Sequence, residues 1–412
     1  MCGGLVLLSA VALAPSPAET LPALSPPPIS GYTPDMTITL DVSPAVNGRA
    51  GLGRYAATLA AALERERPGA VRLFANLTSG ARDLPELAGL PLRSVRIGYK
   101  PWRMAVWLGQ LAGVGFDRLL PAGSALFHAT EHLLLPLRRL PTVLTVHDLI
   151  YRLFPAHHRR LNYWYLNAAM PLYVRRASHI ITISESSKRD LMRLYGTPAE
   201  KITVIYEAAA PHFKPPPAER IEAVRVRYGL PERTLITVGT IEPRKNLPRL
   251  IEALAALRRD DPALRLVIAG AKGWLTGGFF AALERFGQQE AVILPGYVSD
   301  EDLPALYAGA TVAVQPSLYE GFGLPVLEAM ACGVPVACSA TSSLGEIAGD
   351  AALTFDPENV EEIIAALRRL LADADLREEL RRKGFARAAE FSWERAARET
   401  WAVYDRLMVT GG

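Results

Sequence analysis

The stretch QPSLYEGFGLPVLEAMACG occupies residues 315–333 and indicates the fold class most directly. A β-branched run predicts a strand over 311–315, and a glycine-rich segment then leads into a helix predicted over 325–332. Pro325 falls in the first turn of that helix, where its missing N–H is tolerated. Gly333 follows the helix end, where glycine is common. This strand–loop–helix order is typical of one βα unit of a parallel sheet.

The same stretch predicts an anion site flanked by two carboxylates. The backbone N–H groups of Phe322, Gly323 and Leu324 would point out of the helix N-terminus, which favours a phosphate. Glu320 precedes this segment and Glu328 lies in the first turns of the helix. Paired acceptors beside a phosphate site suit a ligand with many hydroxyl groups, such as a sugar or a ribose. For Glu328 alone, the alternative is a carboxylate that complements the helix dipole.

Outward from this stretch, short β-branched runs alternate with longer helical periods from Met36 onward, which predicts βαβ units. In the first half, strands are predicted over 37–41, 71–76, 125–127, 142–146, 179–183 and 202–205, and helices over 53–65 and 161–176. In the second half, strands are predicted over 235–238, 264–268, 291–294, 311–315 and 334–338, and helices over 247–258, 303–309, 325–332 and 360–371. We therefore expect an α/β fold with two doubly wound, Rossmann-like domains facing across a cleft.

The change in composition at residues 208–218, which are rich in Pro and Ala, predicts a linker. We therefore expect an N-terminal Rossmann-like domain over 36–207 and a C-terminal Rossmann-like domain over 219–390. Residues 391–412 form a last helix whose apolar residues share one face; their spacing leaves open whether this helix packs on its own domain or crosses back to the first. Residues 1–35 are rich in Pro and Ser, and we expect them to be disordered, with Met36 as the true start. A cleaved signal peptide is the alternative.

The overall composition excludes several classes of protein. Half of the 412 residues are hydrophobic and 21% are charged, which excludes a disordered chain. The formal net charge of +3 gives no support to a nucleic-acid partner. Three cysteines exclude a disulfide scaffold and favour a reducing compartment, so we expect a cytoplasmic protein. No apolar run reaches the roughly 18 residues of a membrane-spanning helix.

A second segment, VGTIEPRKNL at 238–247, places Arg244 and Lys245 between a predicted strand and a predicted helix. Two cations on such a turn suit a pyrophosphate, because Arg offers forked donors and Lys a point charge. The alternative is a solvated basic turn. His147 follows the strand predicted over 142–146 and would face the carboxyl-end crevice of the sheet. For a lone histidine in that position, a structural role is the more common one.

A third segment contains Gly51 and Gly53, which together with Ala56 match the dinucleotide fingerprint only formally. The strand that ends at Asp41 is too far away for the tight turn that the fingerprint needs, and the next strand ends at Asn76 rather than at an acidic residue. These departures argue against an NAD-dependent oxidoreductase.

Other patterns carry weaker hypotheses. Residues 373–375 spell D-x-D, a metal motif, but lie in a predicted amphipathic helix and are expected to be a solvated face. Two basic and aromatic clusters, at 157–165 and at 93–107, suit a membrane surface or an anionic acceptor, with a solvated, aromatic-packed surface as the alternative.

Glu320 and Glu328 match the E-x7-E pattern of a known family, and the chain resembles the retaining GT-B glycosyltransferases of family GT4, which includes bacterial mannosyltransferases. The resemblance extends from Asp41 to Tyr404. It implies that Glu320 contacts the donor sugar and that Glu328 accepts hydrogen bonds from the ribose. It further implies that His147 also binds the donor sugar.

The resemblance also implies that Arg244 and Lys245 hold the pyrophosphate and that the segment of Gly51 and Gly53 approaches the donor phosphate. Many relatives place Arg after the strand-end glycine, where this chain has Thr240, so more weight falls on Arg244. The N-terminal domain is then the acceptor domain and the C-terminal domain the nucleotide-sugar domain.

The resulting hypothesis is a retaining hexosyltransferase that uses a nucleotide diphosphate sugar, GDP-mannose first and UDP-glucose second, and needs no cofactor and no essential metal. The acceptor is a glycan, a lipid-linked or a small molecule, and peripheral contact with the inner membrane face is a further expectation. A UDP-sugar 2-epimerase-type isomerase would lack the E-x7-E pattern. A non-catalytic nucleotide-binding protein would be expected to have lost Glu320, Lys245 or His147. Linkage and oligomeric state are not predicted.

Overall fold

The structure is a computed structural model that describes residues 37–157 and 160–410. The expectations for residues 1–35 and for a start at Met36 lie outside the described residues.

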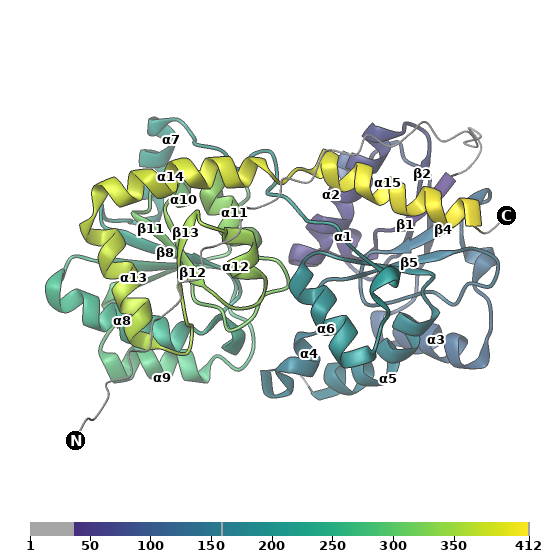
Figure 1. The fold of residues 1–412 in the computed structure, drawn as a ribbon, viewed down its shortest axis with the longest axis horizontal. Coiled ribbons are helices and arrows are strands. Elements are labelled where there is room, and N and C mark those ends of the chain that lie inside the picture. Colours follow the sequence, from purple (N-terminus) through teal and green to yellow (C-terminus); the bar gives the residue numbers. More distant parts are fainter. Residues whose placement is uncertain (1–36, 158–159, 411–412) are drawn as a thin grey trace, which may run out of the picture. The chain divides into compact units, whose positions relative to one another are not determined.

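The first half of the described chain forms a parallel seven-stranded sheet in the order β3-β2-β1-β4-β5-β6-β7 (Figure 1). Its strands are β1 (Thr37–Asp41), β2 (Val71–Asn76), β3 (Leu92–Val95), β4 (Ser124–Ala129), β5 (Thr142–Val146), β6 (His179–Thr182) and β7 (Ile202–Val204). The strand order reverses between β1 and β4, and ligands commonly bind at the carboxyl ends of strands at such a point.

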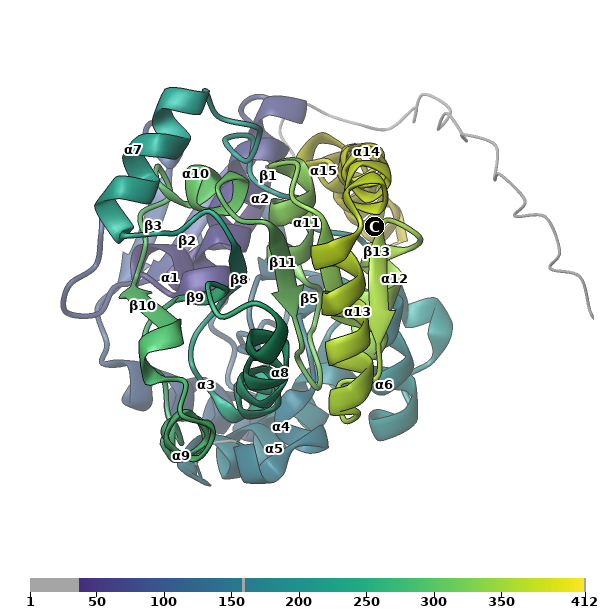
Figure 2. The ribbon, with the colours of Figure 1, turned by 90° about the vertical axis from the view of Figure 1, so that its left-hand side faces the viewer.

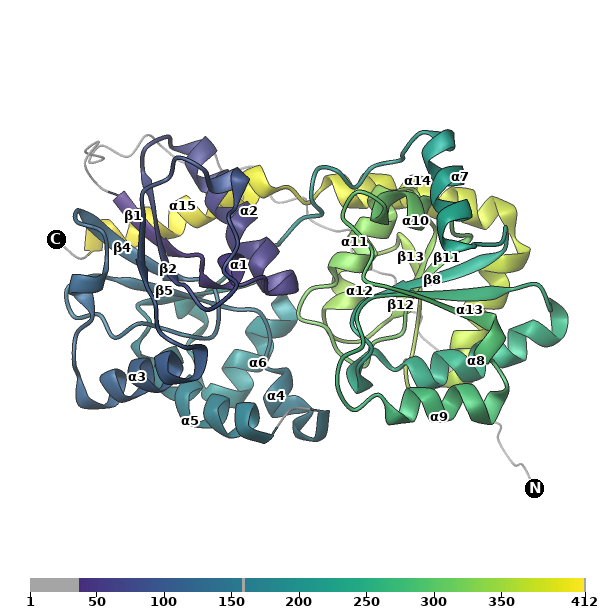
Figure 3. The same ribbon diagram turned by 180° about the vertical axis from the view of Figure 1, so that it is seen from behind.

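Helices cover both faces of this sheet, as buried parallel strands require. They are α1 (Ser43–Val46), α2 (Ala50–Glu66), α3 (Tyr99–Ala112), α4 (Ile150–Leu153), α5 (Arg160–Arg176) and α6 (Glu185–Tyr195), with 3-10 turns at Pro85–Leu87, Asp117–Leu119, Pro155–His157 and Ala199–Lys201. Figure 3 shows α2 on one side of the sheet and α3 and α5 on the other.

The second half forms a parallel six-stranded sheet in the order β10-β9-β8-β11-β12-β13. Its strands are β8 (Thr234–Val238), β9 (Arg265–Ala269), β10 (Val292–Gly296), β11 (Val312–Gln315), β12 (Val336–Ser339) and β13 (Ala352–Phe355). The order reverses between β8 and β11, which brings the segments after these two strands to one place at the sheet edge.

The helices of the second half are α7 (Ala218–Tyr228), α8 (Leu247–Asp260), α9 (Gly277–Phe286), α10 (Leu303–Ala308), α11 (Leu324–Ala331), α12 (Ser342–Ala348), α13 (Val360–Ala372) and α14 (Ala374–Ala389), with 3-10 turns at Pro243–Lys245 and Gln289–Ala291. Figure 2 shows α8, α9 and α13 gathered away from α10 and α11. A buried apolar cluster joins α8, α9 and α13 to the sheet.

The last helix, α15 (Trp393–Thr410), packs against α2 in the first half of the chain. The indole N–H of the buried Trp401 donates to the carbonyl of Leu63 at 3.1 Å. Asp405 accepts two hydrogen bonds from the guanidinium of Arg67, at 2.6 and 2.7 Å. The C-terminal helix α15 therefore packs on the first half of the chain.

The expected α/β architecture of two doubly wound parallel sheets is confirmed, and each predicted strand corresponds to an observed one. Three expectations are wrong in detail. The helix predicted over 53–65 begins three residues earlier, so that α2 contains Gly51 as well as Gly53. Asp373 is not inside a helix: its carboxylate caps α14 by accepting from the Leu376 N–H at 2.9 Å. Trp102 does not belong to the surface, because it packs in the core against Phe74 and Phe116.

Candidate active site

Glu320 follows β11 and gathers donors from two loops. Its side chain accepts hydrogen bonds from the Lys245 ammonium at 2.7 Å, from the Ser317 hydroxyl at 2.6 Å and from the Arg244 guanidinium. Only 8% of Glu320 is exposed. The residues that sequence spacing assigned separately to a sugar and to a pyrophosphate therefore form one buried ion cluster.

The charge of Glu320 depends on this cluster. Burial by itself would raise the pKa of the carboxyl group, because it disfavours the charged form. Arg244 and Lys245 outweigh burial, and with the hydrogen bonds from Lys245 and Ser317 they hold the pKa of Glu320 well below its usual range. The carboxylate is therefore ionised throughout the physiological pH range.

The turn that carries Arg244 and Lys245 is held in place by the residue that follows it, Asn246. Arg244 and Lys245 belong to a 3-10 turn, and Asn246 after them adopts the left-handed conformation (φ 57°), which asparagine tolerates better than most residues. The Asn246 side-chain amide donates to the carbonyls of Pro316 and Pro357 at 3.0 and 2.7 Å. This amide ties the turn after β8 to the segment after β11, which keeps the cations beside Glu320.

Helix α11 begins four residues after Glu320. Gly323 precedes the helix with φ 118°, a conformation that favours glycine, and a Cβ there would meet the Leu344 side chain at 2.8 Å. Within residues 37–157 and 160–410, the structure records no hydrogen bond from the N–H groups of Phe322, Gly323 or Leu324. Three donors and the positive end of the helix dipole are thus available to an anion.

Glu328, on α11, has different surroundings. It is 3% exposed and accepts hydrogen bonds from the Arg54 guanidinium at 2.9 Å and from the Tyr307 hydroxyl at 3.1 Å. Arg54 lies on α2 and also donates to Asp300 at 2.7 Å. Burial raises the pKa of Glu328 to about 7, and Arg54 and Tyr307 only partly oppose it.

His147 follows β5 and is buried with both ring nitrogens engaged. Nε2 lies 2.8 Å from the carbonyl oxygen of Thr130, and Nδ1 lies 3.4 Å from the carboxylate of Glu207. Burial would lower the pKa of His147, but the Glu207 carboxylate outweighs it and raises the pKa above its usual value. A protonated ring would donate from both nitrogens, and the pair with Glu207 favours that form.

The two glycines of the third segment differ from each other. A Cβ at Gly53 would meet the carbonyl oxygen of Pro44 at 2.9 Å, so the close packing of α2 on α1 accounts for this glycine. A Cβ at Gly51 would meet nothing within 4 Å. No contact of Gly51 requires a glycine, and the assignment of both residues to a donor phosphate stays a prediction.

The structure adds residues that sequence reasoning missed. Arg54 pairs with Glu328, Tyr307 donates to the same carboxylate, and Glu207 pairs with His147. Arg54 directly follows Gly53, but nothing in the sequence indicates that it pairs with Glu328. Glu207 stands just after β7, at the carboxyl edge of the first sheet, and that position was the available signal.

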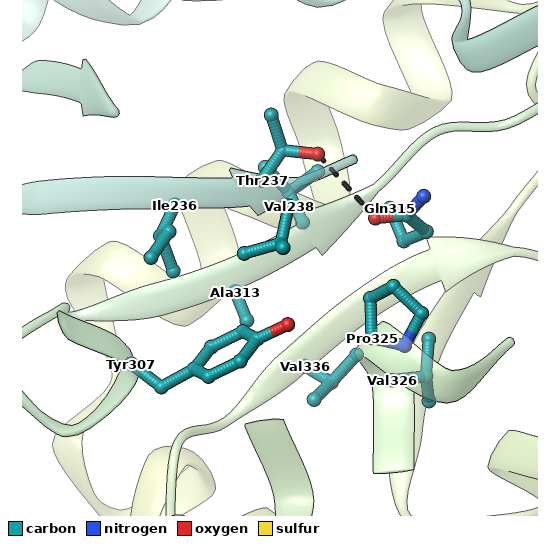
Figure 4. Close-up of a pocket in the computed structure, with 10 residues that line it drawn as sticks. Ile236, Thr237, Val238, Tyr307, Ala313, Gln315, Pro325, Val326 and Val336 are labelled. Carbon is teal, nitrogen blue, oxygen red and sulfur yellow. Dashed lines mark hydrogen bonds between the residues drawn. The ribbon is translucent and has the colours of Figure 1, made fainter. Parts of the chain in front are cut away.

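The space beneath the site is small. Figure 4 shows the side chains around a pocket of about 10 Å³ that is lined by Tyr307, Thr237 and Gln315 among others. The Thr237 hydroxyl donates to the Gln315 side chain at 3.4 Å. The pocket holds about one water molecule. Glu328 does not line this pocket; its hydrogen bonds come from Arg54 and Tyr307, and a ligand would take the place of Arg54 or share the carboxylate with it.

Residues 37–157 and 160–410 contain no group of three or more His, Cys, Asp or Glu side chains arranged to hold a metal ion. Within the same ranges, every helix is too short or too polar to cross a bilayer.

Comparison with known proteins gives consistent matches. The family model described as Glycosyl transferases group 1 matches residues 221–387, and the model described as Glycosyltransferase Family 4 matches residues 49–213. The O-antigen chain mannosyltransferase B of Escherichia coli is 37% identical over 276 residues, which are 66% of this chain and 72% of that protein.

Two solved structures show the same fold. Sucrose-phosphate synthase from Thermosynechococcus elongatus has a TM-score of 0.71 at 21% identity, over 91% of this chain and 100% of that chain. The Anabaena protein HepE in complex with UDP-glucose has a TM-score of 0.71 at 19% identity, over 90% of this chain and 100% of that chain. Such likeness at low identity shows the two-domain GT-B fold, as expected.

Proposed function

This chain belongs to the glycosyl transferases group 1, of GT4 type, and is a hexosyltransferase. We propose that it transfers mannose from GDP-mannose and that the anomeric configuration of the mannose is retained. The acceptor is a hydroxyl group of a glycan, a lipid-linked or a small molecule. The mannosyltransferase that is 37% identical supports the choice of sugar. UDP-glucose is the alternative donor.

The cluster of Glu320, Arg244 and Lys245 carries this proposal. A departing nucleoside diphosphate gains negative charge in the transition state, and buried cations aimed at that charge stabilise it strongly. Arg244 and Lys245 are in place and adjacent, and the free N–H groups before α11 add donors. In the proposed step the bond from C1 to the phosphate oxygen breaks and the bond from C1 to the acceptor oxygen forms. The acceptor proton passes to the departing phosphate.

Glu320 and His147 act on the sugar in this proposal. The Glu320 carboxylate is ionised and has acceptor capacity for a sugar hydroxyl, although two cations already share it. The pair with Glu207 raises the pKa of His147 and so favours its protonated form at the carboxyl end of β5. Both residues would orient the sugar while its anomeric carbon becomes electron-deficient, and neither needs to form a covalent bond to it.

Glu328 is proposed to accept hydrogen bonds from the ribose hydroxyls. Arg54 and Tyr307 now donate to it, so nucleotide binding would exchange the bond from Arg54 for one from the ribose. Asp300 already shares Arg54 and would keep it. This exchange removes the cationic partner of a buried carboxylate, so the ribose hydroxyls and Tyr307 have to compensate for the lost ion pair.

The proposed reaction uses no cofactor and no essential metal, because protein cations supply the charge that a metal would. The proposed location is the cytoplasm, with peripheral contact at the inner membrane face when the acceptor is lipid-linked. Exposed apolar and basic side chains around α3 support such contact.

The test is a panel of nucleotide sugars with the full chain, scored for donor hydrolysis, which needs no acceptor. We expect GDP-mannose to be consumed fastest, at an unchanged rate in EDTA, and proton NMR of the first-formed sugar to show the α configuration of the donor. If UDP-glucose is consumed faster than GDP-mannose, UDP-glucose is the donor. Loss of activity in EDTA that manganese restores would contradict the metal-free mechanism. Hydrolysis of none of the nucleotide sugars would contradict the proposal as a whole.

A further inference from the structure

A third contact, besides the two hydrogen-bonding partners of its nitrogens, restrains the ring of His147. The Thr130 carbonyl and the Glu207 carboxylate hold the two ring nitrogens, but they leave the ring free to tilt about the line that joins those nitrogens. The ring of Tyr55 lies against His147 with centroids 4.7 Å apart and planes at 85°. This edge-to-face contact opposes the tilt, because a tilted imidazole would enter the space of the phenol ring.

Tyr55 is a buried residue of α2, and its hydroxyl group is restrained as well. Tyr55 is 4% exposed, and its hydroxyl oxygen lies 3.1 Å from the hydroxyl oxygen of Thr145. Thr145 belongs to β5 and precedes His147 by two residues, so Tyr55 contacts both the strand and the residue that follows its end. The phenol ring is therefore held at both ends, by its covalent bond to α2 and by its hydrogen bond to β5.

The hydrogen bonds continue from Thr145 as a buried chain that ends on α15. The Thr145 hydroxyl oxygen lies 2.7 Å from Nε2 of His128, on β4, and Nδ1 of His128 lies 2.6 Å from the hydroxyl oxygen of Tyr404, on α15. All three side chains are fully buried. Helix α15 contacts both α2 and β4 (Figure 1). A helix from the far end of the chain is thus connected, through hydrogen-bonded side chains, to the tyrosine that lies against His147.

His128 is the neutral member of this hydrogen-bonded chain. Burial and the nearby charge of His147 lower the pKa of His128 to about 3. A neutral imidazole donates from one nitrogen and accepts at the other, so His128 can serve both of its hydroxyl partners. Any positive charge of the two histidines therefore stays on His147, beside Glu207.

The polar character of this buried chain needs a reason other than packing. Apolar side chains could fill the space between α2, β4 and α15 without the cost of burying polar groups. A hydrogen-bonded network instead holds its members in a single arrangement. At this place, that arrangement includes the phenol ring of Tyr55 against His147.

We propose that Tyr55 is a positioning residue, which fixes the ring of His147 for contact with the donor sugar, and that α15 keeps Tyr55 in place through the hydrogen-bonded chain that starts at Tyr404. Tyr55 acts through His147 and does not itself touch the substrate. A misplacement of about 1 Å in an orienting group can lower a rate about a hundredfold, so a residue that prevents it affects turnover. The inference rests on the proposed role of His147 in sugar transfer.

The test measures hydrolysis of the nucleotide sugar that the donor panel identifies, with the full chain. Tyr55→Leu removes the ring and should lower kcat about thirtyfold, because His147 becomes free to tilt. Tyr55→Phe keeps the ring and should hold kcat within about threefold of the unaltered protein. Tyr404→Phe removes the first hydroxyl of the chain and should lower kcat by a similar factor of about three. Affinity for the free nucleoside diphosphate should stay unchanged in all three variants, because this ligand carries no sugar.

A double variant tells positioning from a structural role. When His147 is already replaced by Gln, Tyr55→Leu should cause no further loss of kcat, because the residue through which Tyr55 acts is gone. The matched control is Tyr173→Leu, at another fully buried tyrosine of the first half, whose hydroxyl oxygen lies 2.8 Å from that of Tyr165. This control should lower the midpoint of urea unfolding and leave kcat of the folded protein unchanged.

The outcomes separate this inference from the proposed function. Unchanged hydrolysis by His147→Gln would remove His147 from the site, and the inference with it. A loss of kcat in His147→Gln without a loss in Tyr55→Leu would overturn the inference alone. So would an equal effect of Tyr55→Leu with and without His147. Unchanged kcat in Tyr404→Phe would overturn the contribution of α15.

Discussion

Two buried glutamates, Glu320 and Glu328, stand eight residues apart and have opposite electrostatic surroundings. Both lose water, and burial alone would raise the pKa of each. Glu320 has two nearby cations and a hydroxyl donor, and its pKa falls well below the usual range. Glu328 has Arg54, which it shares with Asp300, and one tyrosine, and its pKa rises to about 7. Arg244 is also divided, with Glu242, but Lys245 pairs with Glu320 alone, and this additional cation accounts for the opposite sign of the shift.

The opposite pKa shifts of Glu320 and Glu328 indicate that the two carboxylates have different roles in the site. Glu320 keeps a permanent charge and holds Arg244 and Lys245 in place, which suits the part of the site where the reaction occurs. Glu328 changes its charge near neutral pH, which makes the predicted ribose contact sensitive to pH.

The largest effect is expected when Glu320 loses its charge. Glu320→Gln should lower turnover of the donor about a hundredfold or more, because groups that act on transition-state charge have effects of that size. Affinity for GDP should be kept or should increase, since Arg244 and Lys245 lose a competing partner. Turnover and calorimetric titration measure the two effects. Glu358→Gln, at an exposed position, is the matched control, and full activity of Glu320→Gln would remove Glu320 from the site.

The next effect concerns the cation beside Glu320. Lys245→Ala should weaken GDP binding about thirtyfold, the lower end of the cost of removing one partner from a buried charge pair, about 2 kcal/mol. GMP should be affected less, because the distal phosphate is absent. Lys214→Ala, in the exposed linker, serves as control. An equal loss for GMP and GDP would place Lys245 away from the distal phosphate.

A smaller effect is expected from pH. Glu328 accepts hydrogen bonds best when ionised, so GDP affinity should fall as pH drops below about 7, by at most about tenfold per pH unit. The sign for stability is the opposite. The pKa of Glu328 is higher in the folded state than its ordinary value, so folding binds a proton and the free energy of unfolding should decrease as pH rises from about 4.5 to 7.

Glu328→Gln should remove both of these pH dependences. Titrations and urea melts at pH 5, 6, 7 and 8 measure them. Unchanged pH profiles in the variant would mean that another group titrates.

The smallest effect is expected at Tyr307. Its hydroxyl donates to Glu328 and lowers the pKa of that group, and a hydrogen bond of this kind contributes about 0.5–1.5 kcal/mol. Tyr307→Phe should move the midpoint of the pH dependence of GDP binding upward by about 0.4–1 pH unit. A downward movement would contradict the assigned direction of the hydrogen bond.

The sequence predicted the strands well because parallel strands that are buried on both faces appear as β-branched runs. It missed β3, whose residues Leu92, Arg93 and Ser94 are exposed at the sheet edge and show no such run. It also missed α3, where Pro101 and several aromatic residues obscure the helical period. In the site, spacing identified Glu320, Arg244 and Lys245 as functional candidates.

Spacing along the chain did not reveal which of these side chains pair. The partners Arg54 and Glu328 are 274 residues apart, and their contact depends on the folded arrangement of α2 and α11. The pair of His147 and Glu207 likewise joins the end of β5 to the last residue of the predicted N-terminal domain, 60 positions along the chain.

The most direct test of the separation between Glu320 and Glu328 is a cycle of calorimetric titrations. GDP and 2′,3′-dideoxy-GDP would be compared on the unaltered protein, on Glu328→Gln and on Glu320→Gln. We expect the unaltered protein and Glu320→Gln to prefer GDP by about tenfold, which corresponds to about 1.4 kcal/mol, and Glu328→Gln to bind both nucleotides equally. The same preference for GDP in all three proteins would contradict the assignment of Glu328 to the ribose and with it the division of the site.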